Sequence, residues 1–313
     1  MKKKQLMTGV NRVLFRGGKG EVPMHVLRSW LFVPGSDSKK IEKARESLAD
    51  VVIFDLEDAV SVNEKSSARN KVKEAVNTRD GKLKYVRVNS FFTPFLIEDI
   101  NSIVGEGLAG IILPKSENKE QLLLIDYLMN QLERNKNLKQ KIEIMPLIES
   151  ACGIYNAYEI ARSCDRIQRL AFGSVDFALD INAELTEDGN ELLYARSQLV
   201  IASRAAGIEP PIDAVYLNIK DTGGLWKETR FVKQLGFQGK LVIHPNQIQT
   251  VNEVFVPSLQ EIEESQIIVE AYGKALSEGI GVVQVKGKMV DVPVIERAKK
   301  IIEKSEFLSS LIK

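Results

Sequence analysis

Eight short, mostly apolar runs alternate with helix-length segments along this chain, and that alternation limits its fold more than any other feature. The runs occupy residues 29–34, 50–57, 84–89, 109–115, 142–149, 169–174, 214–219 and 240–245. Continuous apolar runs are typical of strands buried on both faces of a parallel sheet. The segments between them include residues 38–48, 63–76, 119–135, 191–207 and 225–236. Successive β–α units of this kind predict an α/β protein whose strands form a (β/α)8 TIM barrel.

A doubly wound open sheet is the alternative fold for such a pattern. Dinucleotide-binding sheets of that type carry a GxGxxG turn after their first strand. Here Gly35 follows Pro34 without further glycines in that pattern. The barrel is therefore the favoured interpretation.

Three regions follow from the length of the chain. A barrel needs about 250 residues, and residues 28–255 supply it. Residues 1–27 form a basic N-terminal extension without a continuous apolar core, which argues against a secretory signal. Residues 256–313 exceed what the barrel needs and predict helices at 258–279 and 294–313, with a hairpin at 281–293 between them. We expect this C-terminal extension to contact a neighbouring subunit.

Charge and composition exclude several classes of protein. The chain has 43 basic and 42 acidic residues and a net charge of +1, which gives no bulk attraction to nucleic acid or to an anionic membrane. No apolar stretch approaches the roughly 18–20 residues that span a bilayer. Cys152 and Cys164 are the only cysteines, without a CxxC motif, and a zinc site is not indicated. Two reduced thiols fit a cytoplasmic location.

Polar residues gather where the apolar runs end, which is where a TIM barrel places its catalytic groups. Glu149 ends the run 142–149, and Asp176 follows the next run. Two carboxylates from adjacent strand ends suit Mg²⁺, which takes one or two carboxylates and leaves positions for substrate oxygens. The alternative is that each carboxylate caps the helix that follows it.

Four more candidates follow the second and third runs. Asp55, Glu57 and Asp58 suit contacts to the water shell of a hydrated cation, and Glu57 is counted among the candidate catalytic residues. Arg87 ends the third run, where its guanidinium needs an anionic partner. That partner is either a substrate oxyanion or one of the three acids, and the two roles are compatible. N-capping and solvated charge remain the alternative for the acids.

Other residues at the strand ends give weaker signals. Lys115 follows Pro114, and we expect it to be charged and ion-paired rather than a Schiff-base lysine. His244 has the chemistry of a general base, but a hydrogen-bonding structural role is favoured. The glycines of 35–36 and 173–174 are positions where the backbone can approach a ligand closely.

These residues, in this order, resemble the citrate lyase beta-subunit/malyl-CoA lyase family of the HpcH/HpaI aldolase superfamily. The matching stretches are RSWLFVPGS (28–36), DVVIFDLEDAV (50–60), YVRVN (85–89), ILPK (112–115), LIESACGI (147–154), FGSVDFALD (172–180), YARSQLVIASRAAG (194–207), IHPNQI (243–248) and MVDVPVIERA (289–298). The resemblance covers roughly residues 28–300 and is specific, because content, order and spacing agree together.

The resemblance implies a TIM barrel, Mg²⁺, a CoA-thioester substrate and a homotrimer or a hexamer of trimers. It assigns the metal to Glu149 and Asp176, with Glu149 also near the substrate, and the substrate oxygen to Arg87. It assigns the thioester and CoA path to Phe32, Val33, Lys43 and the backbone of Val175. Asp291 would be the acid that reaches a neighbouring subunit's site and moves a proton there.

One position departs from the family pattern. Relatives often carry a basic residue directly after PGS, where it helps to hold CoA, and this chain has Asp37 there. The usual grip on the CoA phosphates is therefore in question.

The expected activity is Mg²⁺-dependent cleavage of a 3-hydroxy-3-carboxyacyl-CoA, such as malyl-, citramalyl- or citryl-CoA, into an acyl-CoA and a 2-oxo acid. The first alternative is the lyase subunit of a multi-subunit citrate lyase, which acts on an acyl-carrier thioester. Two others are an aldolase that splits 2-keto-3-deoxy acids without CoA, and a scaffold protein without activity. The sequence does not identify the acyl group.

Overall fold

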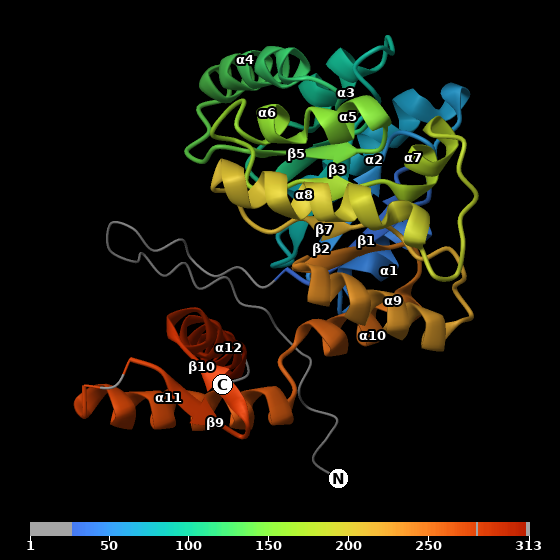
Figure 1. Cartoon of the computed structure of the whole chain (residues 1–313). Coiled ribbons are helices and arrows are strands. Elements are labelled where there is room, and N and C mark those ends of the chain that lie inside the picture. The colour runs from blue at the N-terminus through green and yellow to red at the C-terminus, as the bar shows by residue number, and fades with distance from the viewer. Residues whose placement is uncertain (1–26, 280, 311–313) are drawn as a thin grey trace. The chain divides into compact units, whose positions relative to one another are not determined.

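Eight parallel strands pair in chain order and close into a barrel, in a computed structural model that describes residues 27–279 and 281–310 (Figure 1). They are β1 (Ser29–Pro34), β2 (Val51–Asp55), β3 (Leu83–Arg87), β4 (Gly110–Leu113), β5 (Glu143–Ile148), β6 (Ala171–Phe172), β7 (Ile212–Asp213) and β8 (Gly239–Val242). The closing pair joins β1 to β8, with Trp30 opposite Leu241. The TIM barrel predicted from the alternating runs is confirmed, and the open sheet is excluded.

One strand was predicted at the wrong place. The apolar run 214–219 suggested a strand, but β7 ends at Asp213, and its Ile212 pairs with Ala171 and Gly239. The following residues form a loop, in which the Tyr216 hydroxyl donates to Asp221 at 2.6 Å. Ala214 is buried, but Leu217 and Ile219 are 56% and 41% exposed, so the second half of the run that imitated a strand is open to solvent.

Helices follow the strands and form the outer layer of the barrel. They are α1 (Ser38–Arg45), α2 (Lys65–Asn77), α3 (Leu96–Ile103), α4 (Lys119–Asn135), α5 (Ala151–Tyr155), α6 (Ala157–Ala161), α7 (Ser174–Asp180), α8 (Leu193–Ala206), α9 (Thr222–Leu235) and α10 (Pro245–Phe255), with short 3₁₀ turns η1 (Val62–Glu64) and η2 (Asn190–Leu192). Their starts follow local sequence signals. For example, Asn118 and Gln121 form a reciprocal capping box at the start of α4.

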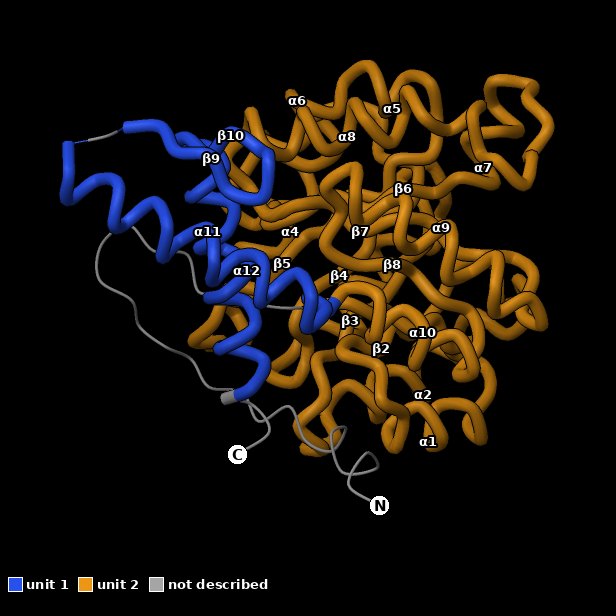
Figure 2. The backbone as a smooth tube through the Cα atoms, turned by 60° about the horizontal axis from the view of Figure 1, so that its bottom comes forward, with its two compact units in different colours: residues 1–26, 256–313 blue, residues 27–255 orange. Residues whose placement is uncertain are grey.

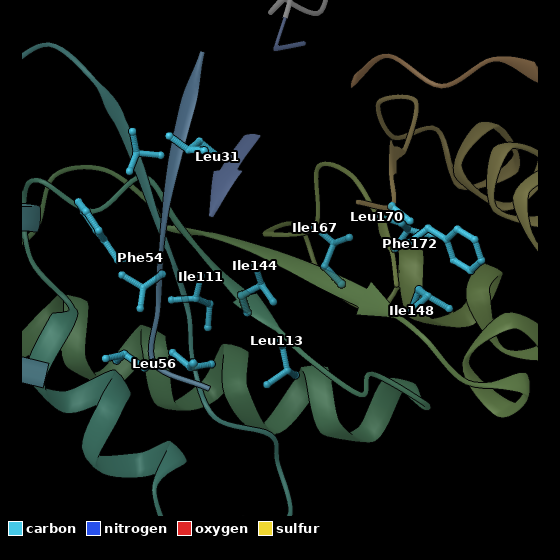
Figure 3. Close-up of a cluster of buried hydrophobic side chains, with 14 of the residues drawn as sticks. Leu31, Phe54, Leu56, Ile111, Leu113, Ile144, Ile148, Ile167, Leu170 and Phe172 are labelled. Atoms are coloured by element: carbon cyan, nitrogen blue, oxygen red, sulfur yellow. The ribbon is translucent and has the colours of Figure 1, made fainter. Parts of the chain in front are cut away.

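Side chains alternate between two apolar layers along each strand, as the pleat requires. Outward residues pack against the helices in a large buried cluster, which includes Leu31, Phe54, Ile111, Ile144 and Phe172 (Figure 3). Inward residues fill the barrel with a second cluster, which contains Trp30, Ile53, Tyr85, Ile112, Met145, Leu147, Ala171, Ile212 and Leu241. The barrel is therefore a packed core, and a ligand has room only at the open ends of its strands.

The C-terminal residues from Val256 belong to a separate compact unit, coloured differently from Leu27–Phe255 in Figure 2. It contains α11 (Leu259–Ser277), the antiparallel pair β9 (Val283–Val285) and β10 (Lys288–Val290), and α12 (Val292–Ser310). Lys286 and Gly287 join the two strands with φ of 48° and 79°, the left-handed backbone that a two-residue hairpin turn requires. Tyr272, Val285, Val290 and Ile295 form a small core of its own.

Three further expectations concern the N-terminal extension, membrane spans and the cysteines. Residues 1–26 of the expected basic extension lie outside the described residues. No helix within the described ranges combines the length and apolarity that a bilayer crossing requires. Cys152 and Cys164 are both free thiols.

Candidate metal and substrate site

The candidate residues lie at the carboxyl ends of the strands, and the pleat explains why several point inward. Asp55 is the next inward position after Ile53 on β2, and Arg87 is the next after Tyr85 on β3. The register pairs Asp55 directly with Arg87. Glu149 continues the inward series of Met145 and Leu147 just after β5. Strand alternation and register thus bring an arginine and two carboxylates to one rim of the barrel.

Glu149 is buried, 5% exposed, and one of its carboxylate oxygens faces the backbone of the loop that follows β4. Its Oε1 accepts a hydrogen bond from the Lys115 N–H at 2.8 Å, and among the described residues no cation pairs with it. Lys115 has φ of 51°, a left-handed conformation that is costly for a residue with a side chain. This strain at the rim points the Lys115 N–H at Glu149.

Gly173 makes room for that carboxylate. Leu147 pairs with Ala171 and Ile148 with Phe172, so the next step of the register sets Glu149 beside Gly173. A Cβ atom at Gly173 would lie 2.5 Å from Glu149 Oε2 and 2.7 Å from its Cβ. The glycine at this strand end is therefore needed for packing against Glu149.

Asp176 lies in the first turn of α7, close enough to act on Glu149 through its charge. Burial, and then the Asp176 charge, raise the pKa of Glu149 to about 8. Glu149 does not cap α5, because Ser150 supplies that cap, whereas Asp176 lies in the first turn of α7, where the helix dipole also favours an acid. Two carboxylates that act on each other through their charges, and that form no ion pair within the described residues, fit a divalent cation, whose charge would favour their ionised forms.

The donor set also fits the type of metal. Within the described part of the chain, no group of three or more histidine, cysteine, aspartate or glutamate side chains could hold an ion. Glu149 and Asp176 would thus be the two protein ligands, and the remaining positions would be open to water and substrate. Mg²⁺ is commonly bound in this way. That these two residues hold the metal stays a prediction.

Arg87 is held by three acids of the turn after β2. Its Nε donates to Asp55 Oδ1 at 2.8 Å and its Nη2 to Asp55 Oδ2 at 2.6 Å. Its Nη1 lies 3.0 Å from Glu57 Oε2 and 3.2 Å from Asp58 Oδ2. Burial opposes the charge of Arg87, but the hydrogen bonds and charges of these acids outweigh it and raise the Arg87 pKa. The structural pairing left open by the sequence is therefore present.

Glu57 is a buried acid of this turn with a raised pKa. It is 8% exposed, and burial raises its pKa to about 7, with Arg87 opposing the rise. Asp55 instead accepts from the N–H groups of Glu57 and Ala59, at 2.9 and 3.1 Å, and so caps its own turn. A carboxyl group with a pKa near neutrality is suited to accept and return a proton.

The residues expected along the CoA path differ in burial and in position. The Phe32 ring lies 5.0 Å from the Arg87 guanidinium, inside the rim. Val33 is 3% exposed in the outer cluster, so only its backbone could face a ligand. Lys43 on α1 is exposed, and so is Val175 on α7.

Asp37, the acid at the position where the resemblance implies a basic residue, has a local structural role. Its Oδ1 accepts from the N–H groups of Lys39 and Lys40, at 3.0 and 3.1 Å, and caps the start of α1. The Asp37 carboxylate therefore stabilises the start of α1.

Asp291 and His244 complete the predicted set. Asp291 lies in the C-terminal unit, directly before α12, where the Val294 N–H donates to its Oδ1 at 3.4 Å. Its action at a neighbouring subunit's site stays a prediction. His244 accepts from the Asn246 N–H through Nδ1 at 3.2 Å, which agrees with the structural role favoured for it.

Sequence reasoning missed the residues of α2 that support the turn 55–58. Lys65 and Arg69 lie on the buried face of α2, together with Ala68 and Val72. The signal was present, because charged residues spaced by four on an otherwise apolar helix face need buried partners.

We expect Gly173→Ala to weaken Mg²⁺ binding about 10- to 100-fold, the range seen when the support of a metal ligand is disturbed. The added methyl group would displace Glu149, whereas the fold should persist. Calorimetric titration with Mg²⁺ measures this. Gly223→Ala is the matched control, because its Cβ would meet only Asp221 Oδ1, at an ordinary 3.6 Å. Unchanged affinity in Gly173→Ala would show that Glu149 is not a ligand.

The barrel, the two carboxylates and the arginine at its rim together fit the class of metal-dependent TIM-barrel enzymes. Comparison with known proteins narrows this class. The family model described as HpcH/HpaI aldolase/citrate lyase matches residues 28–245, and a model described as C–C bond lyase of the TIM-barrel fold matches residues 196–309. The chain belongs to the HpcH/HpaI aldolase/citrate lyase family, a family of carbon–carbon lyases.

Three relatives illustrate the similarity. Citrate lyase subunit beta of Leuconostoc mesenteroides subsp. cremoris is 39% identical over 279 residues, which cover 88% of this chain and 92% of the relative. L-malyl-CoA/beta-methylmalyl-CoA lyase of Cereibacter sphaeroides is 34% identical over 310 residues, covering 92% and 97%. CitE of Mycobacterium tuberculosis, in complex with magnesium, acetoacetate and coenzyme A, is 28% identical with a TM-score of 0.74, covering 89% and 98%.

The predictions of the family, of a metal-dependent lyase and of Mg²⁺ as its cofactor are confirmed by these findings. Magnesium is present in several of the related CitE structures, with and without coenzyme A.

Proposed function

We propose that this chain is a Mg²⁺-dependent lyase that cleaves a 3-hydroxy-3-carboxyacyl-CoA into an acyl-CoA and a 2-oxo acid. The observation that carries this proposal is the rim itself, where Glu149 and Asp176 form no ion pair with any described residue and interact through their charges, as Glu149 also does with Glu57 and Arg87. The CoA-bound CitE relative and the malyl-CoA lyase relative support the thioester substrate.

The chemistry is a retro-Claisen cleavage. When bound, Mg²⁺ supplies a Lewis acid and a template for substrate oxygens. Glu57, with its pKa of about 7, is the group of the rim best suited to take the proton from the substrate hydroxyl. As the carbon–carbon bond opens, its electrons pass to the thioester as an enolate, and the hydroxyl carbon becomes the carbonyl carbon of the 2-oxo acid. Protonation of the enolate, for which Asp291 is the candidate, completes the acyl-CoA.

Arg87 stabilises the negative charge that develops on oxygen. Asp55 holds its Nε and Nη2, which fixes the guanidinium plane. The bond from Nη1 to Asp58 is the easiest to exchange, because it is 3.2 Å long and the Asp58 side chain is 65% exposed. A substrate oxygen that replaced Asp58 would receive a charged hydrogen bond, an interaction typically worth about 2.7–4 kcal/mol in the transition state.

The test is to incubate the purified protein with Mg²⁺ and malyl-, citramalyl- and citryl-CoA, and to identify the released 2-oxo acid. Glyoxylate, pyruvate or oxaloacetate would distinguish the three acyl groups, and chelation of Mg²⁺ should stop the release. Absence of any 2-oxo acid with all three, while Mg²⁺ still raises the thermal stability, would overturn the proposal.

A second candidate is the lyase subunit of a multi-subunit citrate lyase, and one observation favours it. The citrate lyase beta relative named above is 39% identical to this chain, against 34% for the malyl-CoA lyase relative named there. The acid Asp37, at a position where the resemblance implies a basic residue that holds CoA, agrees with this candidate. Parallel assays with the same acyl group on CoA and on an acyl-carrier protein separate the two, because the second candidate requires faster cleavage of the carrier thioester.

We also propose that the enzyme is a cytoplasmic homotrimer, or a hexamer of trimers, in which Asp291 of one copy serves the site of another. Asp291→Ala and Asp291→Asn should each lower turnover about 100-fold or more, the contribution of a general acid or base, and change Mg²⁺ affinity little. Asp291→Asn retains an oxygen for the cap of α12, so it separates the proton role from the capping role. Glu296→Ala, an exposed acid on α12, is the control. An unchanged rate in both Asp291 variants would remove it from the mechanism.

A further inference from the structure

Lys65 is buried, 7% exposed, at the first position of α2. A cation is unfavourable there, because the helix dipole places partial positive charge at the N-terminus. Among the described residues its ammonium group forms no ion pair with a carboxylate. Its Nζ instead donates to two backbone carbonyls, Leu56 O at 2.7 Å and Glu57 O at 2.8 Å. Lys65 is thus directed at the turn that surrounds Arg87.

A second set of contacts holds the same turn. The Asn89 Nδ2 donates to Leu56 O at 3.0 Å and to Asp99 Oδ2 at 2.6 Å. Asp99 is fully buried and accepts at Oδ1 from Arg69 Nε, also at 2.6 Å. Lys65 and Arg69 are one helical turn apart on α2, so a single helix supports the turn through two routes.

The fixed carbonyls set the position of Glu57. The turn begins at Asp55, which accepts from Arg87 Nε and Nη2, and continues to Glu57 and Asp58, which contact Arg87 Nη1. The Glu57 carbonyl accepts from Lys65 and also, within the turn itself, from the Val60 N–H at 3.1 Å. The Leu56 carbonyl accepts from Lys65 and from Asn89, which follows β3. Loss of Lys65 would therefore leave the Leu56 end tied to Asn89, whereas among the described residues the Glu57 carbonyl would keep only its local bond to Val60.

Stability alone does not account for this lysine. Burying an ammonium group is costly unless its hydrogen bonds are satisfied. An apolar side chain of similar length would fill the same space beside Phe95, whose ring lies 5.8 Å from Lys65 Nζ, at lower cost.

We propose that Lys65 is a positioning residue of this lyase, which holds the backbone of the turn 55–58 so that the Glu57 carboxylate stays against Arg87. This inference rests on the proposed function, in which Glu57 handles the proton and Arg87 the oxyanion. Lys65 acts on the reaction through the turn and touches neither metal nor substrate.

The experiment compares Lys65→Met with Lys65→Arg, each made as a single substitution in the 313-residue chain. Lys65→Met should lower kcat about 10- to 100-fold, the effect typical of losing a supporting contact, with the substrate KM and the Mg²⁺ affinity within about threefold. Lys65→Arg keeps a cationic donor for the carbonyls and should recover most of the lost kcat. Lys73→Met, an exposed lysine on the same helix, is the control.

Three outcomes would overturn the inference: unchanged kcat in Lys65→Met, equal losses in kcat and Mg²⁺ affinity, or no recovery in Lys65→Arg. A crystal structure of Lys65→Met adds a readout that needs no turnover, because the Glu57 carboxylate should have moved away from Arg87 Nη1. An unmoved turn contradicts the inference even if the unmutated protein cleaves none of the thioesters. Failure of the unmutated protein in the assay, with a displaced turn in Lys65→Met, would instead count against the proposed function alone.

Discussion

Glu149→Gln and Asp176→Asn should each abolish Mg²⁺-dependent cleavage, with a loss of turnover on the order of 10³-fold or more. Each removes one of two carboxylates that would hold the cation, and a catalytic metal ion contributes several kcal/mol of charge stabilisation. The fold should persist, because Gln and Asn preserve the shape of the side chains. Turnover with the substrate panel and Mg²⁺ titration measure the effect. Retained turnover in either variant would overturn the metal assignment.

Glu159→Gln is the control for both substitutions. Glu159 is half-exposed on α6, where its carboxylate lies 3.8 Å from Lys119 Nζ. The control substitution should leave both turnover and Mg²⁺ affinity unchanged. Thermal unfolding gives an independent readout, since Mg²⁺ at 100 times its Kd should stabilise the unmutated protein by about 2.7 kcal/mol. That stabilisation should vanish in Glu149→Gln and persist in Glu159→Gln.

The raised pKa of Glu149 determines in which direction Mg²⁺ affinity changes with pH. A ligand carboxylate must be ionised, and the pKa of Glu149 is about 8 without the cation. Mg²⁺ affinity should therefore fall as the pH drops below about 8, and binding at pH 7 should release a proton. Calorimetry in buffers of different ionisation enthalpy detects that proton, which should be absent in Glu149→Gln.

Asp213→Asn should destabilise the barrel by about 3–5 kcal/mol, the cost of breaking a buried ion pair by removing one partner. Asp213 is fully buried at the end of β7, and its Oδ2 lies 2.6 Å from Lys240 Nζ. Its Oδ1 lies 2.9 Å from Arg196 Nε. The variant would leave two buried cations with Glu228 as their remaining acidic partner. Chemical denaturation measures the change.

Asp188→Asn is the matched control for this substitution. Asp188 and Lys227 are 4.0 Å apart, and their side chains are 75% and 77% exposed. An exposed pair of this kind contributes about 0–1 kcal/mol. Equal unfolding free energies for the Asp213 and Asp188 variants would show that the buried network adds no net stability.

The pH response of this network follows from the same contacts. Burial opposes ionisation of Asp213, but Arg196 and Lys240 outweigh it and lower the Asp213 pKa. A lowered folded-state pKa gives stability that is present above the unfolded-state pKa and is lost as the pH falls through the folded-state value. Asp213→Asn should therefore flatten the acid side of the stability profile.

Much of the rim could be predicted from single strands. Glu149 ends an apolar run, and Arg87 and Asp55 each follow inward positions, so the alternation of the pleat was enough to place them at the barrel mouth. The seventh strand was misplaced because the apolar run 214–219 imitates a strand, although Leu217 in it is exposed. An apolar run alone does not distinguish a buried strand from an exposed loop.

The barrel follows from the amino-acid sequence alone, because alternating buried strands and helices leave few other ways to bury their apolar faces. The sequence also determined the order of the acids and the arginine along the rim, since strand ends in a closed parallel barrel meet at one side. Which of those charges form ion pairs became visible only in the folded chain. Arg87 pairs with Asp55 and Glu57, whereas Glu149 lies against Gly173 and forms no ion pair among the described residues. Such pairings join residues far apart in the chain, so their distances depend on strand register and burial, which no local pattern specifies.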